Sequence, residues 1–207
     1  MSLEFVAHRA GNSPEKLRAA EGHADIIEVD VHRGHHGHTE VRHAKVLWPT
    51  RRLWERWYVL PADHSVSTFD EIIAAAGPTT ALWLDLKGVR SNIAPQVIAM
   101  ARTGRPIVVS TKSWWLLAPY AGVPGVRTFR SAGNRLELAL LRWLPSRVKT
   151  TGAVVNRKLL TDEMISLLKA NGELFTWNVN DQATVKRLAE RGLDGLIVDD
   201  IGLVGQG

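Results

Sequence analysis

Short apolar segments with the composition of β-strands alternate with helix-like segments along the whole chain of 207 residues. Strands that alternate with helices form parallel sheets, and eight such units favour closure into a (β/α)₈ barrel, the TIM barrel of the α/β class. An open doubly wound sheet is the alternative architecture. The expected strands are Leu3–Ala7, Ile26–Val31, Ala81–Leu86, Ile107–Ser110, Val126–Phe129, Ala153–Asn156, Leu174–Val179 and Leu196–Val198.

Seven helices are expected between these strands, and several carry start and stop signals. Thr161 stands before two acidic residues at the start of one helix, and Asn171 and Gly172 close it. The expected helices are Pro14–Glu21, Ser67–Ala76, Ser91–Thr103, Ser113–Ala121, Arg135–Leu144, Thr161–Ala170 and Gln182–Arg191, with Ile201–Val204 as a candidate for a truncated eighth.

Residues 33–65 interrupt the alternation and carry no helical pattern. We therefore expect one domain, residues 1–207, with a short insertion at about residues 44–65. The aromatic and basic composition of this insertion suits a lipid–water interface, or a lid whose aromatic side chains pack on the barrel rim. A peripheral contact with a membrane is one interpretation that this leaves open. The residues concerned are Trp54, Trp57, Tyr58, Arg51, Arg52 and Arg56.

Composition narrows the classes of function. The absence of cysteine excludes disulfide scaffolds, thiolate zinc sites and cysteine nucleophiles. Lysine and arginine number 26 against 21 acidic residues, a net charge of +5, which a phosphate-bearing small molecule explains with fewer assumptions than nucleic acid does. No apolar run reaches the ~18 residues of a membrane span. The first residues carry no basic segment followed by an apolar one, so we expect a cytoplasmic location.

Acidic side chains cluster on the second and third expected strands. Glu28 and Asp30 lie on the second, and Asp85 and Lys87 on the third. Residues i and i+2 of a strand point to the same side, so each pair should face the barrel mouth together. Three carboxylates gathered there repel one another unless a cation lies between them. Oxygen ligands suit a hard divalent ion, so the sequence predicts a site for one Mg²⁺ or Ca²⁺.

Histidines and fixed cations lie near these carboxylates. His8 ends the first strand and His43 follows the second, and the two suit a general acid and a general base in an order that the sequence leaves open. Arg9 and Lys87 suit phosphate oxygens. A metal, two histidines and two cations together favour phosphoryl transfer over carbonyl chemistry.

Other polar residues have two interpretations each. Lys112 follows the fourth strand, Arg130 follows the fifth and Asn156 ends the sixth. All three either contact the phosphate or headgroup of a substrate or belong to solvated loops. Asp85 and Lys87 could instead form a structural ion pair. A group of histidines between residues 32 and 38 is interpreted as a polar surface turn rather than a metal site. These histidines are His32, His35, His36 and His38.

These residues form a pattern that resembles the signature of the glycerophosphodiester phosphodiesterase family. Its distinctive spacing places a histidine, His43, thirteen positions after Asp30. The resemblance covers the whole chain. The matching segments are Ala7-His8-Arg9, Ile27-Glu28-Val29-Asp30-Val31, Gly37, His43, Asp85-Leu86-Lys87, Trp177-Asn178-Val179-Asn180 and Gly192 to Asp199.

The resemblance implies an enzyme of lipid metabolism. Its members hydrolyse glycerophosphodiesters, which are small molecules, to an alcohol and glycerol 3-phosphate with one divalent cation. It also implies that Trp177 forms a wall that contacts the alcohol part of the substrate. Two alternatives stay open. One is a lysophospholipase D or sphingomyelinase D-like enzyme that forms a cyclic phosphate, and the other is a non-catalytic binder of a phosphate-bearing ligand.

The chain departs from the family pattern at several positions. The carboxylate that usually follows the second histidine is replaced by Ala44, which leaves the support of His43 open. Asp85 stands where the family has the longer glutamate. The segment after the first strand is reduced to Gly11-Asn12-Ser13, and the insertion is shorter than the usual small subdomain.

Overall fold

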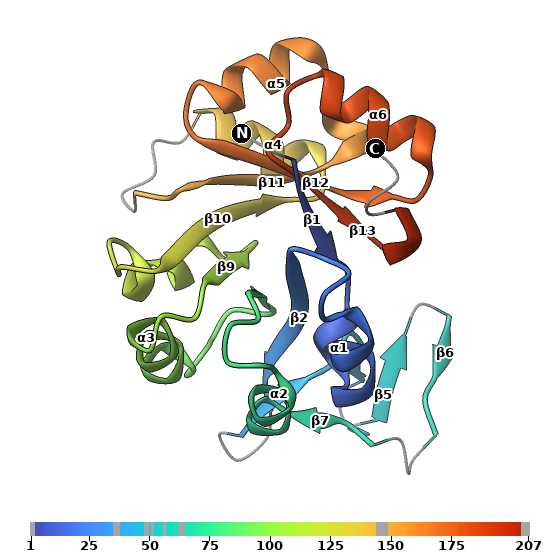
Figure 1. Ribbon diagram of the computed structural model, residues 1–207, viewed down its shortest axis with the longest axis vertical. Helices are drawn as coiled ribbons and strands as arrows, with labels where there is room; N and C mark the ends of the chain where they lie inside the picture. Colours follow the sequence, from blue (N-terminus) through green and yellow to red (C-terminus); the bar gives the residue numbers. More distant parts are fainter. Residues whose placement is uncertain are drawn as a thin grey trace.

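The computed structural model describes residues 3–34, 38–47, 50, 52–55, 57–61, 65–143 and 149–203. Eight parallel strands form a closed ring, because the first strand pairs with both the second and the last. The predicted (β/α)₈ barrel is therefore confirmed, and the open sheet is excluded (Figure 1). In their order around the ring, the strands are β1 (Glu4–Ala7), β2 (Ile26–Arg33), β8 (Leu82–Leu86), β9 (Ile107–Thr111), β10 (Val126–Ala132), β11 (Gly152–Asn156), β12 (Glu173–Val179) and β13 (Gly195–Val198).

Helices surround the ring, three at the bottom of the view in Figure 1 and three at the top. Thr68 begins one with a capping box that it forms with Glu71, and the Thr161 side chain caps another as its sequence indicates. The bottom group is α1 (Pro14–Ala20), α2 (Phe69–Ala75) and α3 (Ala94–Arg102), and the top group is α4 (Arg135–Trp143), α5 (Asp162–Lys169) and α6 (Gln182–Glu190).

Two helical segments differ from the prediction. The segment expected as a helix over Ser113–Ala121 is a 3₁₀ helix, η3 (Trp114–Tyr120), which contains Pro119. Proline has no N–H to donate to the preceding turn, so a regular α-helix is disfavoured there. The candidate eighth helix is the short 3₁₀ turn η5 (Ile201–Leu203), and residue 204 lies outside the described residues. Among the described residues, the other short 3₁₀ turns are η1 (Ala10–Asn12) and η4 (Arg157–Leu159).

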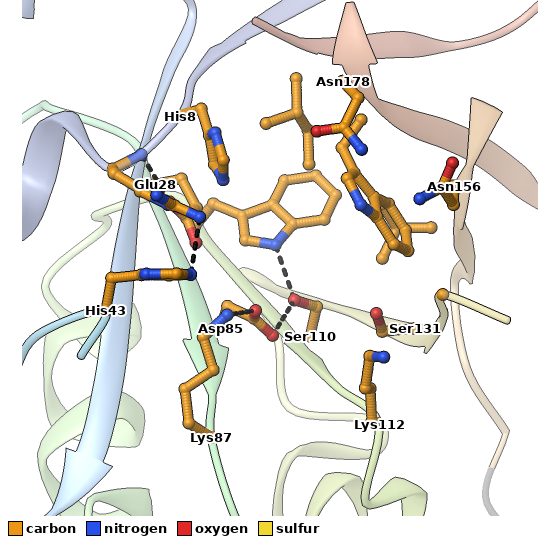
Figure 2. A pocket seen from close by; sticks show the side chains of 16 residues that line it. His8, Glu28, His43, Asp85, Lys87, Ser110, Lys112, Ser131, Asn156 and Asn178 are labelled. Carbon is orange, nitrogen blue, oxygen red and sulfur yellow. Dashed lines mark hydrogen bonds and ion pairs between the residues drawn. The ribbon is translucent and has the colours of Figure 1, made fainter. Parts of the chain in front are cut away.

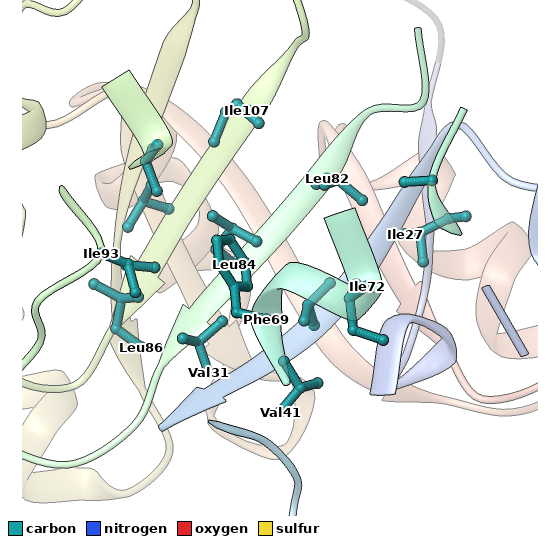
Figure 3. Close-up of a cluster of buried hydrophobic side chains, with 14 of the residues drawn as sticks. Ile27, Val31, Val41, Phe69, Ile72, Leu82, Leu84, Leu86, Ile93 and Ile107 are labelled. Atoms are coloured by element: carbon teal, nitrogen blue, oxygen red, sulfur yellow. The ribbon is translucent and has the colours of Figure 1, made fainter. Parts of the chain in front are cut away.

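Apolar side chains fill both the inside and the outside of the ring. Inside, the rings of Trp83, Phe129 and Phe175 lie with centroids 4.9 to 5.2 Å apart and form a solid plug. Outside, Phe69 and Ile72 of α2 are buried in a cluster with side chains of β2 and β8 (Figure 3). The barrel interior is thus packed, and only its mouth at the carboxyl ends of the strands is open to a ligand.

The segment after β2 leaves the ring and forms short antiparallel strands. β3 (Thr39–Val41) pairs with both β2 and β7 (Ser67–Thr68). A separate sheet, which we call the excursion sheet, consists of β4 (Lys45–Leu47), β5 (Arg52–Glu55) and β6 (Tyr58–Val59). In Figure 1, β5 and β6 lie beside α1, outside the ring. The described part of residues 33–65 holds no helix, as expected.

The predicted surface turn of histidines is wrong for His32. This residue belongs to β2 and is partly buried, and burial lowers the pKa of its ring to about 4. Pairing of β2 with β3 extends the strand to Arg33, beyond the predicted end at Val31. His38 is exposed. Other residues interpreted in the sequence lie outside the described residues: His35, His36, Gly37, Arg51 and Arg56.

Close approach of two strands generates a stability prediction. A Cβ atom added at Gly152 would lie 1.9 Å from the backbone oxygen of Glu173 on the neighbouring strand. Backbone in the middle of a barrel cannot move aside cheaply, so we expect Gly152→Ala to lower the free energy of unfolding by about 1–3 kcal/mol or more. Urea denaturation followed by circular dichroism measures this, and an unchanged midpoint would contradict the close approach.

Candidate active site

A pocket of about 330 Å³ opens at the carboxyl ends of the barrel strands (Figure 2). Each of the eight strands, or the residue or two after it, contributes to its lining. Nine of the ten predicted site residues line this pocket, and the tenth, Asp30, is buried beside it. The nine are His8, Arg9, Glu28, His43, Asp85, Lys87, Lys112, Asn156 and Trp177.

Three carboxylates meet on one side of the pocket. Glu28, Asp30 and Asp85 each offer an oxygen, and these oxygens lie within 4.8 Å of one another. The strand register brings them together, because Asp30 of β2 lies directly opposite Asp85 of β8. Glu28 is 3% exposed and Asp30 is fully buried, so solvent screens their repulsion poorly.

The cations beside these carboxylates compensate the negative charge only in part. Lys87 contacts both Asp85 and Asp30, and its Nζ lies 2.6 Å from Asp30 Oδ1. Although burial opposes it, the charge of Lys87 lowers the pKa of Asp30 to about 2. Burial and the neighbouring charge of Asp30 instead raise the pKa of Glu28 well above its ordinary value. A cluster of three carboxylates that is short of positive charge, with oxygen donors only, fits a hard divalent cation.

Hydrogen bonds hold all three carboxylates in place. The Arg9 N–H donates to Glu28 Oε2 at 2.6 Å. The Asn12 amide donates to Asp30 Oδ2 at 2.8 Å, and its oxygen accepts from the Asp30 N–H at 2.8 Å. The Ser110 hydroxyl donates to Asp85 Oδ1 at 2.9 Å and accepts from the indole of Trp83 at 2.8 Å. Sequence reasoning missed the roles of Asn12 and Ser110. The position of Ser110 opposite Asp85 in the register of β8 and β9 is the signal that could have found it.

His43 is held at both ring nitrogens. Arg9 Nη2 donates to Nε2 at 2.6 Å, and Nδ1 lies 2.9 Å from Glu55 Oε1. A guanidinium can only donate, so Nε2 acts as an acceptor and the proton lies on Nδ1, facing the carboxylate. Burial and the charge of Arg9 lower the pKa of His43, and the charges of Asp30 and Glu55 oppose this. Glu55 comes from β5 of the excursion sheet and supplies the carboxylate that the sequence lacks at Ala44.

His8 is held by a carboxylate from the other end of the chain. Its Nδ1 bonds to Asp199 Oδ1, which follows β13, and the His8 ring points into the pocket (Figure 2). Burial lowers the pKa of His8, and the bond to Asp199 opposes this. Sequence reasoning placed Asp199 in a matching motif and gave it no role.

The wall opposite the carboxylates is polar and carries no carboxylate among the residues that line the pocket. Lys112 lies there but forms an ion pair with Glu137 at 3.1 Å. Asn178 has a φ of 68°, at a register irregularity between β12 and β13, and Figure 2 shows its side chain on the same side of the pocket as Asn156. Such backbone outliers cluster at functional sites. Sequence reasoning placed Asn178 in a matching motif and assigned it no role.

Arg130, interpreted with Lys112 as a contact to phosphate or headgroup, does not line the pocket. Its guanidinium lies 5.5 Å from the ring centre of Trp114, on η3. Residues of a strand alternate between its two faces, and Phe129 and Ser131 on either side of Arg130 take the inward positions.

The chain is similar to one protein family and to several solved structures. Residues 106–203 match the model of the Glycerophosphoryl diester phosphodiesterase family. Over 98% of this chain and 97% of the other, the fold matches the glycerophosphodiester phosphodiesterase from Thermotoga maritima, with a TM-score of 0.73 and 17% identity. A phosphodiesterase from Oleispira antarctica, solved in complex with the product sn-glycerol-3-phosphate, matches with a TM-score of 0.67 and 17% identity, over 95% of this chain and 92% of that one.

A further match is the glycerophosphoryl diester phosphodiesterase structure from Agrobacterium tumefaciens, with a TM-score of 0.75 and 12% identity over 98% of this chain and 96% of that one. The structural matches establish the fold, and the family match supports the resemblance found in the sequence. Within the described part of the chain, no helix combines the length and apolar composition needed to cross a bilayer.

The uncompensated carboxylates generate a prediction for Glu28→Gln. Folding raises the pKa of Glu28, so the folded protein favours the protonated carboxyl group. The folded protein is therefore most stable, as far as Glu28 is concerned, below the ordinary pKa, and it loses that stability as the pH rises through the raised value. At neutral pH in EDTA we therefore expect the variant to melt above the wild type, by about 2–4 °C for each 1 kcal/mol of repulsion removed. Mg²⁺ or Ca²⁺ should raise the melting temperature of the wild type and not of the variant.

Differential scanning fluorimetry measures both effects. The matched control is Glu190→Gln, which removes an exposed carboxylate at the end of α6 and should leave the response to metal unchanged. An identical metal response in Glu28→Gln and the wild type would remove Glu28 from the candidate metal site.

Proposed function

We propose that this chain, a member of the glycerophosphoryl diester phosphodiesterase family, hydrolyses a glycerophosphodiester to an alcohol and glycerol 3-phosphate in a metal-dependent reaction. The observation that carries the proposal is that three carboxylates, two histidines and two cations converge on one pocket. The product bound to the Oleispira antarctica neighbour supports a small glycerophosphate ligand for this fold.

Glu28, Asp30 and Asp85 would hold one divalent cation, Mg²⁺ or Ca²⁺. When bound, the ion neutralises charge on phosphate oxygens and lowers the pKa of an oxygen nucleophile. Lys87 and Arg9 supply the fixed positive charge for the rest of the phosphate, and Arg9 suits paired phosphate oxygens because its donors form a planar fork. Trp177 would contact the alcohol part of the substrate, and Lys112 and Asn156 would contact its phosphate or headgroup.

The partners of the two histidines support a division of roles. His43 Nε2 carries no proton, and its lone pair accepts from Arg9. When the Arg9 guanidinium turns from His43 to the phosphate, this lone pair would be free, so His43 is the better candidate for the base that takes a proton from the attacking hydroxyl. His8 is then the acid that protonates the oxygen of the departing alcohol. The Asp199 carboxylate stabilises the protonated form of His8, which that step requires.

The attacking hydroxyl can belong to the substrate itself. A glycerophosphodiester carries a hydroxyl adjacent to the phosphoester, and its attack on phosphorus avoids an entropy cost of ~7 kcal/mol or more. The first product would then be a cyclic phosphate, which water opens with the two histidines in exchanged roles. A second candidate function, cleavage of lysophospholipids, is favoured by the exposed aromatic residues of the excursion sheet beside the pocket.

Turnover of glycerophosphocholine and of lysophosphatidylcholine, followed by ³¹P NMR, tests the proposal. We expect activity with Mg²⁺ or Ca²⁺ and none in EDTA, and His8→Ala and His43→Ala should each lose ~10² to 10⁴ in rate while they keep the metal-induced rise in melting temperature. Full activity in EDTA would refute the metal-dependent reaction. Rapid cleavage of a substrate without the adjacent hydroxyl would show direct attack by water and exclude the cyclic route.

Glu55 gives a separate prediction, because it touches His43 and no other predicted site residue except Arg9, at 3.7 Å. Glu55→Ala should lower kcat by roughly 10- to 100-fold, the usual cost of losing a partner that orients a functional histidine, with little change in KM. Because Glu55 raises the pKa of His43, the acid limb of the rate profile should move to lower pH in the variant.

The conservative variant Glu55→Gln keeps an oxygen acceptor for Nδ1 and should retain more activity than Glu55→Ala. Glu40→Gln is the matched control, since Glu40 is paired with Arg42 at 2.7 Å and does not contact His43. An unshifted pH profile in Glu55→Ala would mean that Glu55 has only a structural role.

A further inference from the structure

Exposed apolar side chains gather around the mouth of the pocket. Of the twelve large apolar side chains that are exposed among the described residues, nine lie on the excursion sheet or on segments that leave the carboxyl ends of β8, β9 and β10. We call these nine the mouth rim. They are Val46, Leu47, Trp54, Trp57, Tyr58, Val59, Val89, Trp115 and Leu136.

The mouth rim includes aromatic side chains that are unusually exposed for large apolar residues. Trp57 is 95% exposed and Tyr58 is 58% exposed at the turn between β5 and β6. Trp115 and Val89 are 62% and 64% exposed, and a hydrogen bond of 3.4 Å joins the Trp115 indole to the Val89 carbonyl. Single exposed apolar residues are ordinary, whereas a set of them around one opening marks an interaction surface.

Exposed cations accompany the mouth rim. Lys45 lies 5.5 Å from the ring centre of Trp54, in the same sheet. Basic residues interleaved with tryptophan and tyrosine are the composition of protein surfaces that lie at an anionic lipid–water interface. The exposed cations in these segments are Lys45, Arg52, Arg90 and Arg135, and Arg33 is exposed at the end of β2.

Carboxylates on this side of the mouth are engaged by other groups. Glu55 lies 3.7 Å from Arg9, and Glu137 lies 3.1 Å from Lys112. At the start of α2, the Thr68 N–H donates to Glu71, and the Gln96 amide donates to the exposed Asp70 at 3.2 Å. On the opposite side, after β11 to β13, exposed acidic residues outnumber the exposed Lys158, although Asp162 is paired with Arg191 at 2.7 Å. These acidic residues are Asp162, Glu163, Asp181, Asp199 and Asp200. The charge distribution therefore favours contact between an anionic surface and the excursion side.

We propose that the mouth rim docks the protein on an anionic phospholipid surface, tilted with the excursion sheet toward the lipid. The docking surface adjoins the site, because β5 carries both Trp54 of the mouth rim and Glu55, which bonds His43. A lipid phosphodiester in that surface then reaches the pocket without crossing open water. This choice of substrate source rests on the proposed function, whereas the docking itself does not.

Co-sedimentation with vesicles tests the docking. The His8→Ala variant is used, so that no lipid is consumed, with vesicles of phosphatidylcholine alone or mixed with phosphatidylglycerol. We expect binding to the mixed vesicles that weakens as salt is raised. Trp57→Ala combined with Tyr58→Ala should weaken this binding about tenfold or more, since both side chains would lose buried apolar area.

Trp143→Ala is the matched control. Trp143 is 72% exposed at the far end of α4, away from the mouth, and its removal should leave vesicle binding unchanged. In the background that retains His8, the variant with Trp57 and Tyr58 replaced should hydrolyse glycerophosphocholine at the wild-type rate, because that substrate carries no acyl chain.

Two results would overturn the docking. The first is that the protein does not bind the mixed vesicles, and the second is that Trp143→Ala weakens binding as much as the combined Trp57 and Tyr58 changes do. Concentration-dependent dimers that the Trp57 and Tyr58 changes abolish would assign the mouth rim to a second copy of the chain instead. Vesicle binding through the mouth rim without hydrolysis of either diester would retain the docking and refute the proposed function.

Discussion

Repulsion among three carboxylates is the constraint around which the mouth of this barrel is built. The register of β2 and β8 places Asp30 opposite Asp85, and the alternation of β2 brings Glu28 to the same side. Lys87 forms ion pairs with two of them, Asp30 and Asp85. The charge that remains is the physical reason for expecting a divalent cation, and it explains why neighbouring side chains serve to hold carboxylates rather than to fill space.

The parts of the site that follow strand periodicity could be predicted from the sequence. His8 directly follows β1 and Asp85 lies near the end of β8, and a barrel brings such ends to one face. Glu28 follows from the alternation of β2, because it points to the same side as Asp30. Ser110 and Glu55 could not be predicted in the same way. The role of Ser110 depends on which residue of β8 it opposes, and that of Glu55 on how a segment without periodicity folds back onto the barrel.

The two histidines receive their carboxylates from different sources. Asp199 follows the last strand of the ring, within the regular architecture. Glu55 comes from the excursion sheet, which lies outside the ring. In the proposed mechanism one histidine is therefore supported by the barrel and the other by the same small sheet that carries the exposed aromatic residues. Changes that displace the sheet as a whole, unlike truncation of its exposed side chains, would alter the chemistry of His43 and the contact with lipid together.

Closure of the ring between β1 and β13 has a consequence for synthesis of the protein. His8 and Asp199 are 191 positions apart, so the bond between them depends on one of the longest-range contacts in the chain. Such contacts form late, because closing the long loop between the two residues costs conformational entropy before the contact stabilises the fold. A nascent chain on the ribosome therefore has its candidate metal ligands and both histidines well before Asp199, which orients the first of them, emerges. In the proposed mechanism, His8 lacks this partner until the barrel is complete.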